Sequence, residues 1–166
     1  SAARSKPGIP PVQVDAMQAP CKQNILRGNE ANLDRFPIPC AHDKDGGRYA
    51  NTWGTLIVKT LDGKWVNWSI ARVMKVDGKR MTGLIVPSQH IGQIWTQWVE
   101  RCEPMPYALV QGAAPAISCV SGIPIPAQAD EADYIGTLAG EPRPVVKAVS
   151  LELAVPATAV IVLEGP

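Results

Sequence analysis

The sequence lacks an excess of charge of either sign. Sixteen lysine and arginine residues and fifteen aspartate and glutamate residues leave a net charge of +1. Nucleic-acid-binding proteins usually carry a strong basic excess or a basic patch, so we expect no nucleic-acid partner. The chain has 166 residues, of which 46% are hydrophobic. It therefore has the length of one domain and enough apolar side chains for a packed core.

Closely spaced cysteines are also absent. The four cysteines lie too far apart for a CxxC zinc or redox motif. The chain is not one of the small, cysteine-dense proteins that disulfides stabilise, so we expect buried, reduced thiols. The residues concerned are Cys21, Cys40, Cys102 and Cys119.

No segment has the pattern of a secretory signal or of a membrane-spanning helix. The run 107–128 carries no charged residue and is long enough to span a bilayer. Pro115, Pro124 and Pro126 interrupt it, so we interpret the run as buried strand and loop. Because the N-terminus is proline-rich and polar, we expect a cytoplasmic protein with no membrane partner.

The first part of the chain predicts little regular structure. Residues 1–19 lack hydrophobic periodicity and are interpreted as an N-terminal arm or linker. Residues 20–48 are rich in Asn, Asp, Pro and Gly, and such long irregular stretches are usually functional or wrap around another part of a protein. We expect residues 20–166 to form the domain itself.

Hairpin signals then predict an antiparallel meander. Asp62-Gly63 and Asp77-Gly78 separate three apolar segments with β character. Antiparallel strands with a few helices, rather than regular βαβ alternation, indicate a mixed α+β, barrel-like domain. The predicted strands cover 52–60, 65–76, 81–86, 107–111, 145–155 and 159–164.

Two segments predict helices. In the first, 88–103, Ser88 has the character of an N-cap and the apolar residues recur at helical spacing. In the second, 130–138, acidic residues occupy the first turn and Gly140 is a plausible stop. The apolar face of the first helix consists of Ile91, Trp95, Trp98 and Cys102.

Of the two histidines, His42 and His90, only His90 falls at a predicted helix start. Free backbone N–H groups and the helix dipole favour a bound anion such as phosphate at that position. A metal ion held by His90 would bridge to that phosphate. The alternative is an ordinary surface histidine near a helix cap.

Asn67 and Arg72 lie in the apolar segment 65–76, and each needs a polar partner if it is buried there. Residues five apart point to opposite faces of a regular strand, so a bulge is needed to bring both into one cavity. The alternative for Arg72 is an ion pair with Glu131, Asp133 or another acidic residue. The residues alone leave both possibilities open.

Glu131 opens the second predicted helix, directly after the uncharged stretch. One carboxylate, one imidazole and one amide oxygen, together with phosphate oxygens, would suit Mn2+ or Mg2+. The same set would be unusual for zinc, since it contains no thiolate and only one histidine. The alternative for Glu131 is a helix-start carboxylate on a solvated face.

Two strings carry a resemblance to a known family: Asn-Trp-Ser-Ile-Ala-Arg at 67–72 and Pro-Ser-Gln-His at 87–90. They resemble the UbiD family of prenylated-FMN-dependent (de)carboxylases, which act on aromatic and α,β-unsaturated acids. Further strings are similar to the family in the same order, from roughly residue 20 to residue 165. They are 19–21 (APC), 37–39 (PIP), 45–49 (DGGRY), 112–116 (GAAPA), 130–142, 155–157 (VPA) and 162–165 (VLEG).

The resemblance implies a split β-barrel of the FMN-binding type and a metal-mediated grip on a flavin phosphate. Asn67, His90 and Glu131 would bind Mn2+ (or Mg2+) on the phosphate of prenylated FMN, with a K+ ion nearby. Arg72 would be the catalytic residue, beside the flavin ring, where a guanidinium binds the substrate carboxylate and stabilises negative charge. The other cofactor-binding residues implied are Ser69, Ile70, Gln89, Ser121, Gly122, Ile123 and Pro124.

The implied reaction is a reversible, non-oxidative decarboxylation through a covalent adduct with prenylated FMN, which acts as the electron sink. CO2 leaves, and a nearby acid supplies a proton. The chain departs from the family at 159–162, where a usual glutamate is replaced by Val160, and it ends at Pro166, before the family's catalytic acid pair. We therefore expect one piece of a split or trimmed enzyme.

The resemblance also implies partners. These are a small carboxylic acid substrate, the remaining segments of the enzyme or a companion chain with the acid pair, and a flavin prenyltransferase as cofactor supplier. The complete enzyme would be an oligomer. Two alternatives stay open: a non-catalytic flavin-binding module, and an interaction domain without a cofactor, in which replacing His90 by Ala would change nothing.

Overall fold

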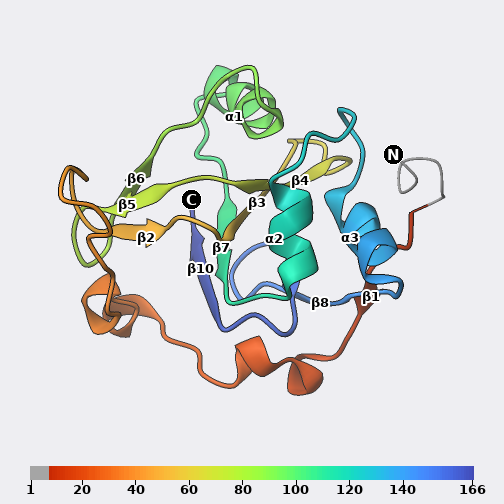
Figure 1. Cartoon of the computed structure of the whole chain (residues 1–166), viewed down its shortest axis with the longest axis horizontal. Helices are drawn as coiled ribbons and strands as arrows, with labels where there is room; N and C mark the ends of the chain where they lie inside the picture. Colours follow the sequence, from red (N-terminus) through yellow and green to blue (C-terminus); the bar gives the residue numbers. More distant parts are fainter. Residues whose placement is uncertain (1–7) are drawn as a thin grey trace.

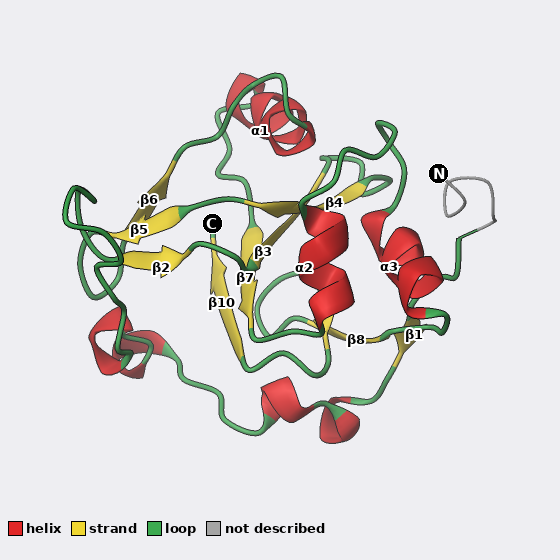
Figure 2. Ribbon diagram, in the orientation of Figure 1, coloured by secondary structure: helices red, strands yellow, loops and turns green. Residues whose placement is uncertain are grey.

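The computed structural model describes residues 8–166, whose strands form three small sheets. A four-stranded sheet has the order β10-β7-β3-β4, and the two three-stranded sheets have the orders β1-β8-β9 and β2-β5-β6. Figure 2 shows the strands through the middle of the molecule and toward its left side, with the longer helices above and to the right of them. This mixed α/β architecture with antiparallel sheets agrees with the predicted class. The strands of the described part do not close into a barrel, so the split barrel stays a prediction.

The helices and strands have the following bounds. The strands are β1 (Val12–Gln13), β2 (Tyr49–Asn51), β3 (Thr55–Lys59), β4 (Val66–Ile70), β5 (Val73–Lys75), β6 (Met81–Gly83), β7 (Tyr107–Gln111), β8 (Pro144–Lys147), β9 (Ala154–Pro156) and β10 (Ile161–Gly165). The α-helices are α1 (His90–Glu100), α2 (Pro115–Ser121) and α3 (Glu131–Ala139), and short 3-10 turns are η2 (Ala16–Gln18), η3 (Pro20–Lys22), η4 (Gly28–Glu30) and η5 (Leu33–Arg35).

The four-stranded sheet is covered on both faces, which explains why β3 is apolar at consecutive positions. Ile57 belongs to a core cluster that includes Ile117 of α2 and Ile135 of α3. Its neighbour Val58 belongs to a second cluster, which includes Ile94 of α1. Successive side chains of a strand point to opposite faces, so β3 contributes to both cores, and β7 does the same through Ala108 and Leu109. In Figure 1, α1 lies at the top of the view, while α2 and α3 lie side by side on the right.

The predicted meander is wrong in its middle strand, because the segment 65–76 divides into β4 and β5. β4 pairs with β3, whereas β5 pairs with β2 and β6 in another sheet. The side-chain amide of Asn51 donates to the carbonyl oxygen of Ala71 at 2.8 Å. This bond satisfies the backbone where the chain leaves one sheet for the other.

The run 107–128 contains a helix that the sequence interpretation missed. Strand β7 is confirmed, but α2 follows it and begins at Pro115. Proline is tolerated in the first turn of a helix, where its missing N–H group would have no partner. Treating Pro115 only as a helix breaker was therefore the error.

The predicted strand 145–155 is also wrong, because it is a hairpin of β8 and β9. The N–H of Ala148 donates to the carbonyl oxygen of Leu153 at 2.8 Å across the turn. At the tip, the N–H groups of Val149 and Ser150 donate to the Glu164 carboxylate at 2.7 and 2.6 Å. These groups bind a side chain of β10 instead of continuing a strand.

The two predicted helices are confirmed with small changes at their ends, but the predicted apolar face of α1 is wrong in part. Ile91 and Ile94 are buried, whereas Trp95 and Cys102 are exposed. The N-cap of α1 is Gln89 rather than Ser88, and no side chain caps this helix. Helix α3 has the predicted start and stop, with the Asp130 side chain accepting from Ala132 N and Gly140 in the left-handed region. The uncapped start of α1 leaves backbone N–H groups available beside His90.

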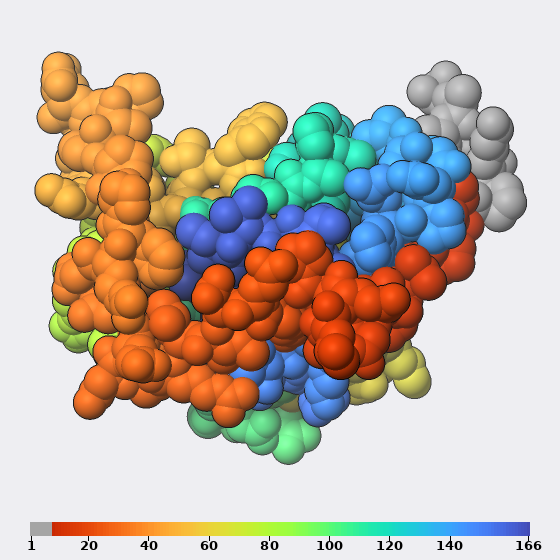
Figure 3. Space-filling model, turned by 90° about the horizontal axis from the view of Figure 1, so that it is seen from below, coloured from red at the N-terminus to blue at the C-terminus, as the bar shows by residue number. Residues whose placement is uncertain are grey.

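The described part of the N-terminal arm is docked on the domain. Ile9 N donates to Asp133 O at 3.2 Å, and β1 pairs in parallel with β8. Residues 20–48 contain only short 3-10 turns as regular structure, and in Figure 3 this segment crosses the face of the molecule in front of the C-terminal strand. The division into an arm and a domain at residue 19 stays a prediction.

Two further expectations concern cysteines and membranes. All four cysteines are free, but the prediction that they are buried is wrong: Cys40, Cys102 and Cys119 are exposed and Cys21 is half-buried. Within residues 8–166, no helix has the length and apolar character needed to cross a membrane.

Candidate functional site

Strand β4 is the centre of the candidate site, because α1, α2 and α3 all contact it. Asn67 lies in β4, His90 is the first residue of α1 and Glu131 is the first residue of α3. The starts of two helices therefore meet beside one strand, at the upper right of Figure 1. Both starts direct the positive ends of their helix dipoles toward the same place.

The three predicted metal ligands are brought together around the Glu131 carboxylate. Asn67 Nδ2 donates to Glu131 Oε1 at 2.5 Å, and His90 Nδ1 lies 3.7 Å from the same oxygen. Trp68 N donates to Glu131 Oε2 at 3.3 Å. Ser69 Oγ donates to Asn67 Oδ1. The side chains of Asn67 and Glu131 are therefore both oriented by hydrogen bonds within the protein.

Burial sets the charge properties of this cluster. Asn67 and Glu131 are only 1% and 3% exposed, which excludes the solvated-face alternative for Glu131. Burial raises the pKa of Glu131 to about 7, against the lowering effect of its own backbone N–H and of hydrogen bonds from Asn67 and Trp68. A carboxylate that is costly to ionise in isolation is stabilised by a nearby cation.

Within residues 8–166, no three His, Cys, Asp or Glu side chains form a group that could hold a metal ion. A metal at this position would need the Asn67 amide oxygen as its third protein ligand. The ligand set would then be one imidazole nitrogen and two kinds of oxygen, which suits Mn2+ or Mg2+ better than zinc.

Trp65 supports this cluster from the residue before β4. Its ring lies edge-on to the His90 ring, with 5.1 Å between centroids. Its Nε1 donates to the Ala129 carbonyl oxygen at 3.2 Å, in the loop that leads to α3. One buried side chain therefore links the starts of α1 and α3.

Arg72 lies beyond the end of β4 and has different partners. Its Nη2 is 3.3 Å from both carboxylate oxygens of Asp45, and its guanidinium lies 3.8 Å above the ring of Tyr49. The acidic partner is therefore neither Glu131 nor Asp133. The Arg72 side chain remains 44% exposed.

The remaining predicted cofactor residues gather only in part. Ser121 Oγ lies 3.0 Å from Thr55 Oγ1, and a Cβ at Gly122 would meet Ile70 Cδ1 at 3.2 Å. The end of α2 thus packs at the end of β4 that carries Ile70. Gln89 is adjacent to His90 as the N-cap of α1, Ile123 is exposed, and Pro124 follows it in the loop.

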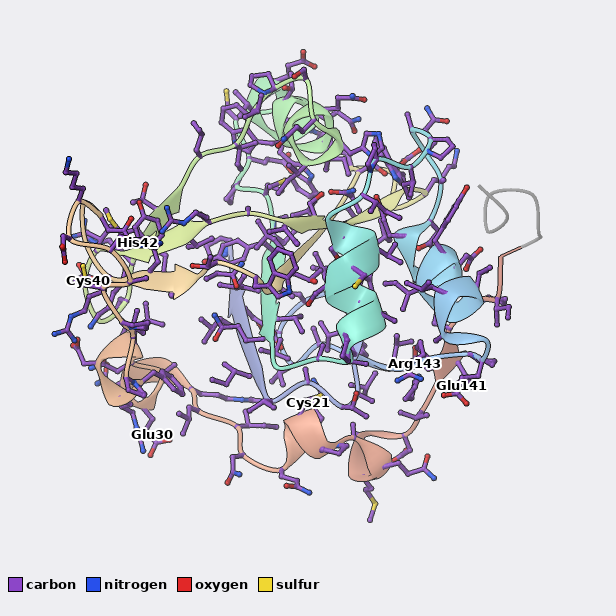
Figure 4. All side chains as sticks on the ribbon, viewed as in Figure 1. Cys21, Glu30, Cys40, His42, Glu141 and Arg143 are labelled. Atoms are coloured by element: carbon purple, nitrogen blue, oxygen red, sulfur yellow. The ribbon has the colours of Figure 1, made fainter. Side chains whose placement is uncertain are left out.

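Two other features lie away from β4. The second histidine, His42, projects near the outer ends of β2 and β5 in Figure 4. A groove of about 850 Å³ runs between the segment 21–36 and β10, and no residue of β4 lines it. Neither feature joins the cluster around Glu131.

Three residues near Arg72 were not identified as functional candidates from residue patterns. Asp45 and Tyr49 appeared only in a string that resembles a family, and Asn51 was not singled out at all. The signal for Asn51 was its place at the start of a segment with β character. An asparagine buried at such a position requires several hydrogen-bond partners.

A model of the UbiD family, described as "3-octaprenyl-4-hydroxybenzoate carboxy-lyase Rift-related domain", matches residues 12–166. The chain belongs to the UbiD family. It is 44% identical over 164 residues to ferulic acid decarboxylase 1 of Saccharomyces cerevisiae, covering 98% of this chain and 33% of the yeast protein.

Two further comparisons agree with this membership of the UbiD family. Pyrrole-2-carboxylic acid decarboxylase of Pseudomonas aeruginosa is 44% identical over 148 residues, covering 89% of this chain and 30% of that enzyme. The structure of the UbiD-class enzyme HmfF from Pelotomaculum thermopropionicum in complex with FMN superposes with a TM-score of 0.92 and 32% identity, covering 99% of this chain and 36% of HmfF. This chain therefore spans about a third of the length of its UbiD relatives.

Proposed function

We propose that this chain is the prenylated-FMN-binding part of a reversible, non-oxidative decarboxylase that acts on an aromatic or α,β-unsaturated carboxylic acid. The observation that supports the proposal most directly is the buried cluster of Asn67, His90 and Glu131. Relatives of this chain are named as decarboxylases of ferulic acid and pyrrole-2-carboxylic acid, and the structure of an evolved form of HmfF is in complex with prFMN.

The donor set fits a divalent cation that is bound to a phosphate. Glu131 is a buried carboxylate beside a neutral amide and an imidazole, so a cation would balance its charge. The uncapped start of α1 offers N–H groups to phosphate oxygens. We assign Asn67, His90 and Glu131 as ligands of Mn2+ (or Mg2+), and we retain a nearby K+ ion as part of the proposal.

Other residues would hold the rest of the cofactor. Ser69 and Ile70 at the end of β4 and Gln89 before α1 flank the cluster, and the loop 121–124 packs near Ile70. Bound prenylated FMN would supply the electron sink for loss of CO2. The proposal also includes a split β-barrel as the fold type of this cofactor-binding domain.

Arg72 would bind the substrate carboxylate. Its guanidinium is partly exposed and has one nitrogen engaged with Asp45, so other N–H groups remain for a planar anion. It would also stabilise negative charge that develops during loss of CO2. The proton that replaces CO2 would come from an acid outside this chain, on remaining segments of the enzyme or on a companion chain.

The test is native mass spectrometry of the chain after co-production with a flavin prenyltransferase. We expect a bound flavin and one Mn2+, both lost in His90→Ala. The matched control is His42→Ala, since His42 is the other histidine and lies away from β4. Equal flavin and metal occupancy in the two variants would contradict the assignment.

Turnover is tested separately by adding the acid-bearing part of a related enzyme and measuring CO2 release from cinnamate. Release that depends on Arg72 supports the decarboxylase. Retained flavin with no release under any such condition would favour the non-catalytic flavin-binding module instead.

A further inference from the structure

In the part of the chain that the structure describes, the hydrogen bonds and the ring contact of the Arg72 side chain come from Asp45 and Tyr49, in the segment that precedes β3. We infer that residues 45–51 form a clamp in which Asp45, Tyr49 and Asn51 are positioning residues for the Arg72 guanidinium. The inference rests on the proposed function only for the task of Arg72, which is to bind a carboxylate. The clamp itself is defined by contacts within the chain.

Asn51 fixes the backbone at the position before Arg72. It is 1% exposed, and its Nδ2 donates to the carbonyl oxygens of Ala71 at 2.8 Å and Gly54 at 3.0 Å. Its Oδ1 accepts from Gly54 N at 2.8 Å. A Cβ at Gly54 would lie 2.4 Å from this Oδ1, so the approach requires glycine there. The amide of Asn51 therefore ties the turn before β3 to the point where the chain leaves β4.

Asp45 fixes one nitrogen of the guanidinium. The Asp45 side chain is only 10% exposed, and its own place is set by a local ring of bonds. His42 N donates to Asp45 Oδ2 at 3.2 Å, and Asp45 N donates to His42 O at 3.0 Å. Since the carboxylate cannot rotate freely, its contact with Arg72 Nη2 restricts where that nitrogen lies.

Tyr49 fixes the plane of the guanidinium. A distance of 3.8 Å between the guanidinium carbon and the ring centroid corresponds to a stacked cation–π contact. Within residues 8–166, the hydrogen bonds of this guanidinium use Nη2 alone. Nε, Nη1 and the second N–H of Nη2 are therefore left, so a carboxylate can accept two parallel hydrogen bonds from Nη2 together with Nε or Nη1.

The clamp explains why Arg72 does not simply follow the strand. Asn51 sets its backbone, Asp45 sets one nitrogen and Tyr49 sets its plane, so little freedom remains for the bidentate edge. A side chain restricted in this way loses less conformational entropy when it binds a planar anion. The consequence is a preference for carboxylic acids over neutral analogues that depends on residues 45–51 as well as on Arg72.

The first experiment observes Arg72 directly, without any cofactor or substrate. The Nε–Hε resonance of Arg72, assigned by its loss in Arg72→Lys, is recorded by NMR in the labelled chain. We expect a distinct chemical shift, displaced by the nearby Tyr49 ring, that moves toward the value of a free arginine side chain in Asn51→Asp and in Asp45→Asn. Asp43→Asn is the matched control, because it makes the same change of charge at an exposed position in the same turn. An unchanged Arg72 signal in both clamp variants would overturn the inference.

The second experiment measures binding to the chain loaded with prenylated FMN and Mn2+. Cinnamate and the neutral cinnamamide are titrated into the wild type and Asn51→Asp. Asn51→Asp removes the hydrogen bonds to Ala71 O and Gly54 O, and the lost positioning should weaken cinnamate binding about tenfold and leave cinnamamide within about twofold. Equal weakening of both compounds would mean that Asn51 has a general structural role, which contradicts the clamp.

The two experiments separate the clamp from the proposed function. If the loaded wild type does not prefer cinnamate over cinnamamide, the task assigned to Arg72 is wrong, whereas the NMR result still decides whether residues 45–51 position it. Asp45→Asn serves as the second variant, since it keeps the shape of the side chain and should fold even where a change at the fully buried Asn51 does not.

Discussion

Gly92 offers a quantitative test of how the start of α1 is placed. A Cβ built at this position would lie 2.1 Å from the carbonyl oxygen of Val86 and 2.6 Å from the Cα of Pro87. Both neighbours are backbone atoms, so rotating a side chain cannot relieve the overlap. The substitution Gly92→Ala must therefore push α1, which begins at His90, away from the preceding loop.

Two effects of opposite sign determine the expected change in the free energy of unfolding. Alanine favours a helix interior over glycine by about 1 kcal/mol. Overpacking a close contact costs about 1–3 kcal/mol, and the upper part of this range applies because the contact must open by more than an ångström between backbone atoms. We expect Gly92→Ala to destabilise the chain by about 1–2 kcal/mol, as the difference between these terms.

The assay is urea unfolding followed by tryptophan fluorescence, with Mn2+ titration as a second readout. Gly46→Ala is the matched control, since a Cβ there would lie 3.9 Å from Met74 Sδ, an ordinary contact. The control should change stability by less than about 0.5 kcal/mol. If Gly92→Ala were as stable as the wild type or more stable, helix propensity would dominate and the close approach of α1 to Val86 would be wrong.

Three other substitutions give separate expectations. Glu131→Gln should abolish Mn2+ binding. It removes a buried charge but replaces an oxygen that accepts from Asn67 or Trp68 by an NH2 group, so the free energy of unfolding of the metal-free chain should change by less than about 1 kcal/mol; calorimetry and urea titration measure the two effects. Trp65→Phe should cost about 1 kcal/mol in urea unfolding, because the hydrogen bond to the Ala129 carbonyl is lost. For Glu164, burial raises the pKa, but the hydrogen bonds from Ser150 and Val149 together outweigh burial and hold the pKa below its usual value. Its carboxylate therefore stabilises the fold above a pH of about 4.3, and Glu164→Gln should be less stable than the wild type at neutral pH and approach it as the pH falls through the lowered pKa, as thermal unfolding across pH would show.

The helices α1 and α3 could be predicted because their signals are local. Each has apolar residues at helical spacing and an N-terminal residue of the capping type close to its first turn. Helix α2 is short, and Pro115 has one meaning inside a helix and the opposite meaning at its start. Local sequence does not say which of the two positions a proline occupies.

The change of sheets after β4 could not be predicted for a different reason. The segment 65–76 has continuous β character, and the feature that divides it is a hydrogen bond from Asn51 to Ala71, which lies 20 residues away in the sequence. In the same way, Asp45 lies 27 residues from Arg72. Such pairs depend on tertiary packing, which overrides strand propensity.

The sequence predicted more of the candidate site than of the fold, but it did so by resemblance to a family rather than by hydrophobic periodicity. Asn67, His90 and Glu131 were named as one cluster, and the structure brings them together. Their role as metal ligands stays a prediction. Physical patterns alone left each of them with a surface or core alternative, because no spacing rule connects a strand residue to the first residues of two helices.

The position of Arg72 relative to Asn67 follows from where β4 ends. The two residues are five apart, and a strand rises by about 3.3 Å per residue, so their Cα atoms are separated by at most about 16 Å along the chain. On a continuous strand they would point to opposite faces. Because β4 ends at Ile70 and Asn51 holds the next carbonyl, Arg72 is no longer bound by that alternation. The end of the strand therefore frees Arg72 from the alternation that a bulge was expected to break. Arg72 contacts Asp45 and Tyr49, whereas Asn67 contacts Glu131.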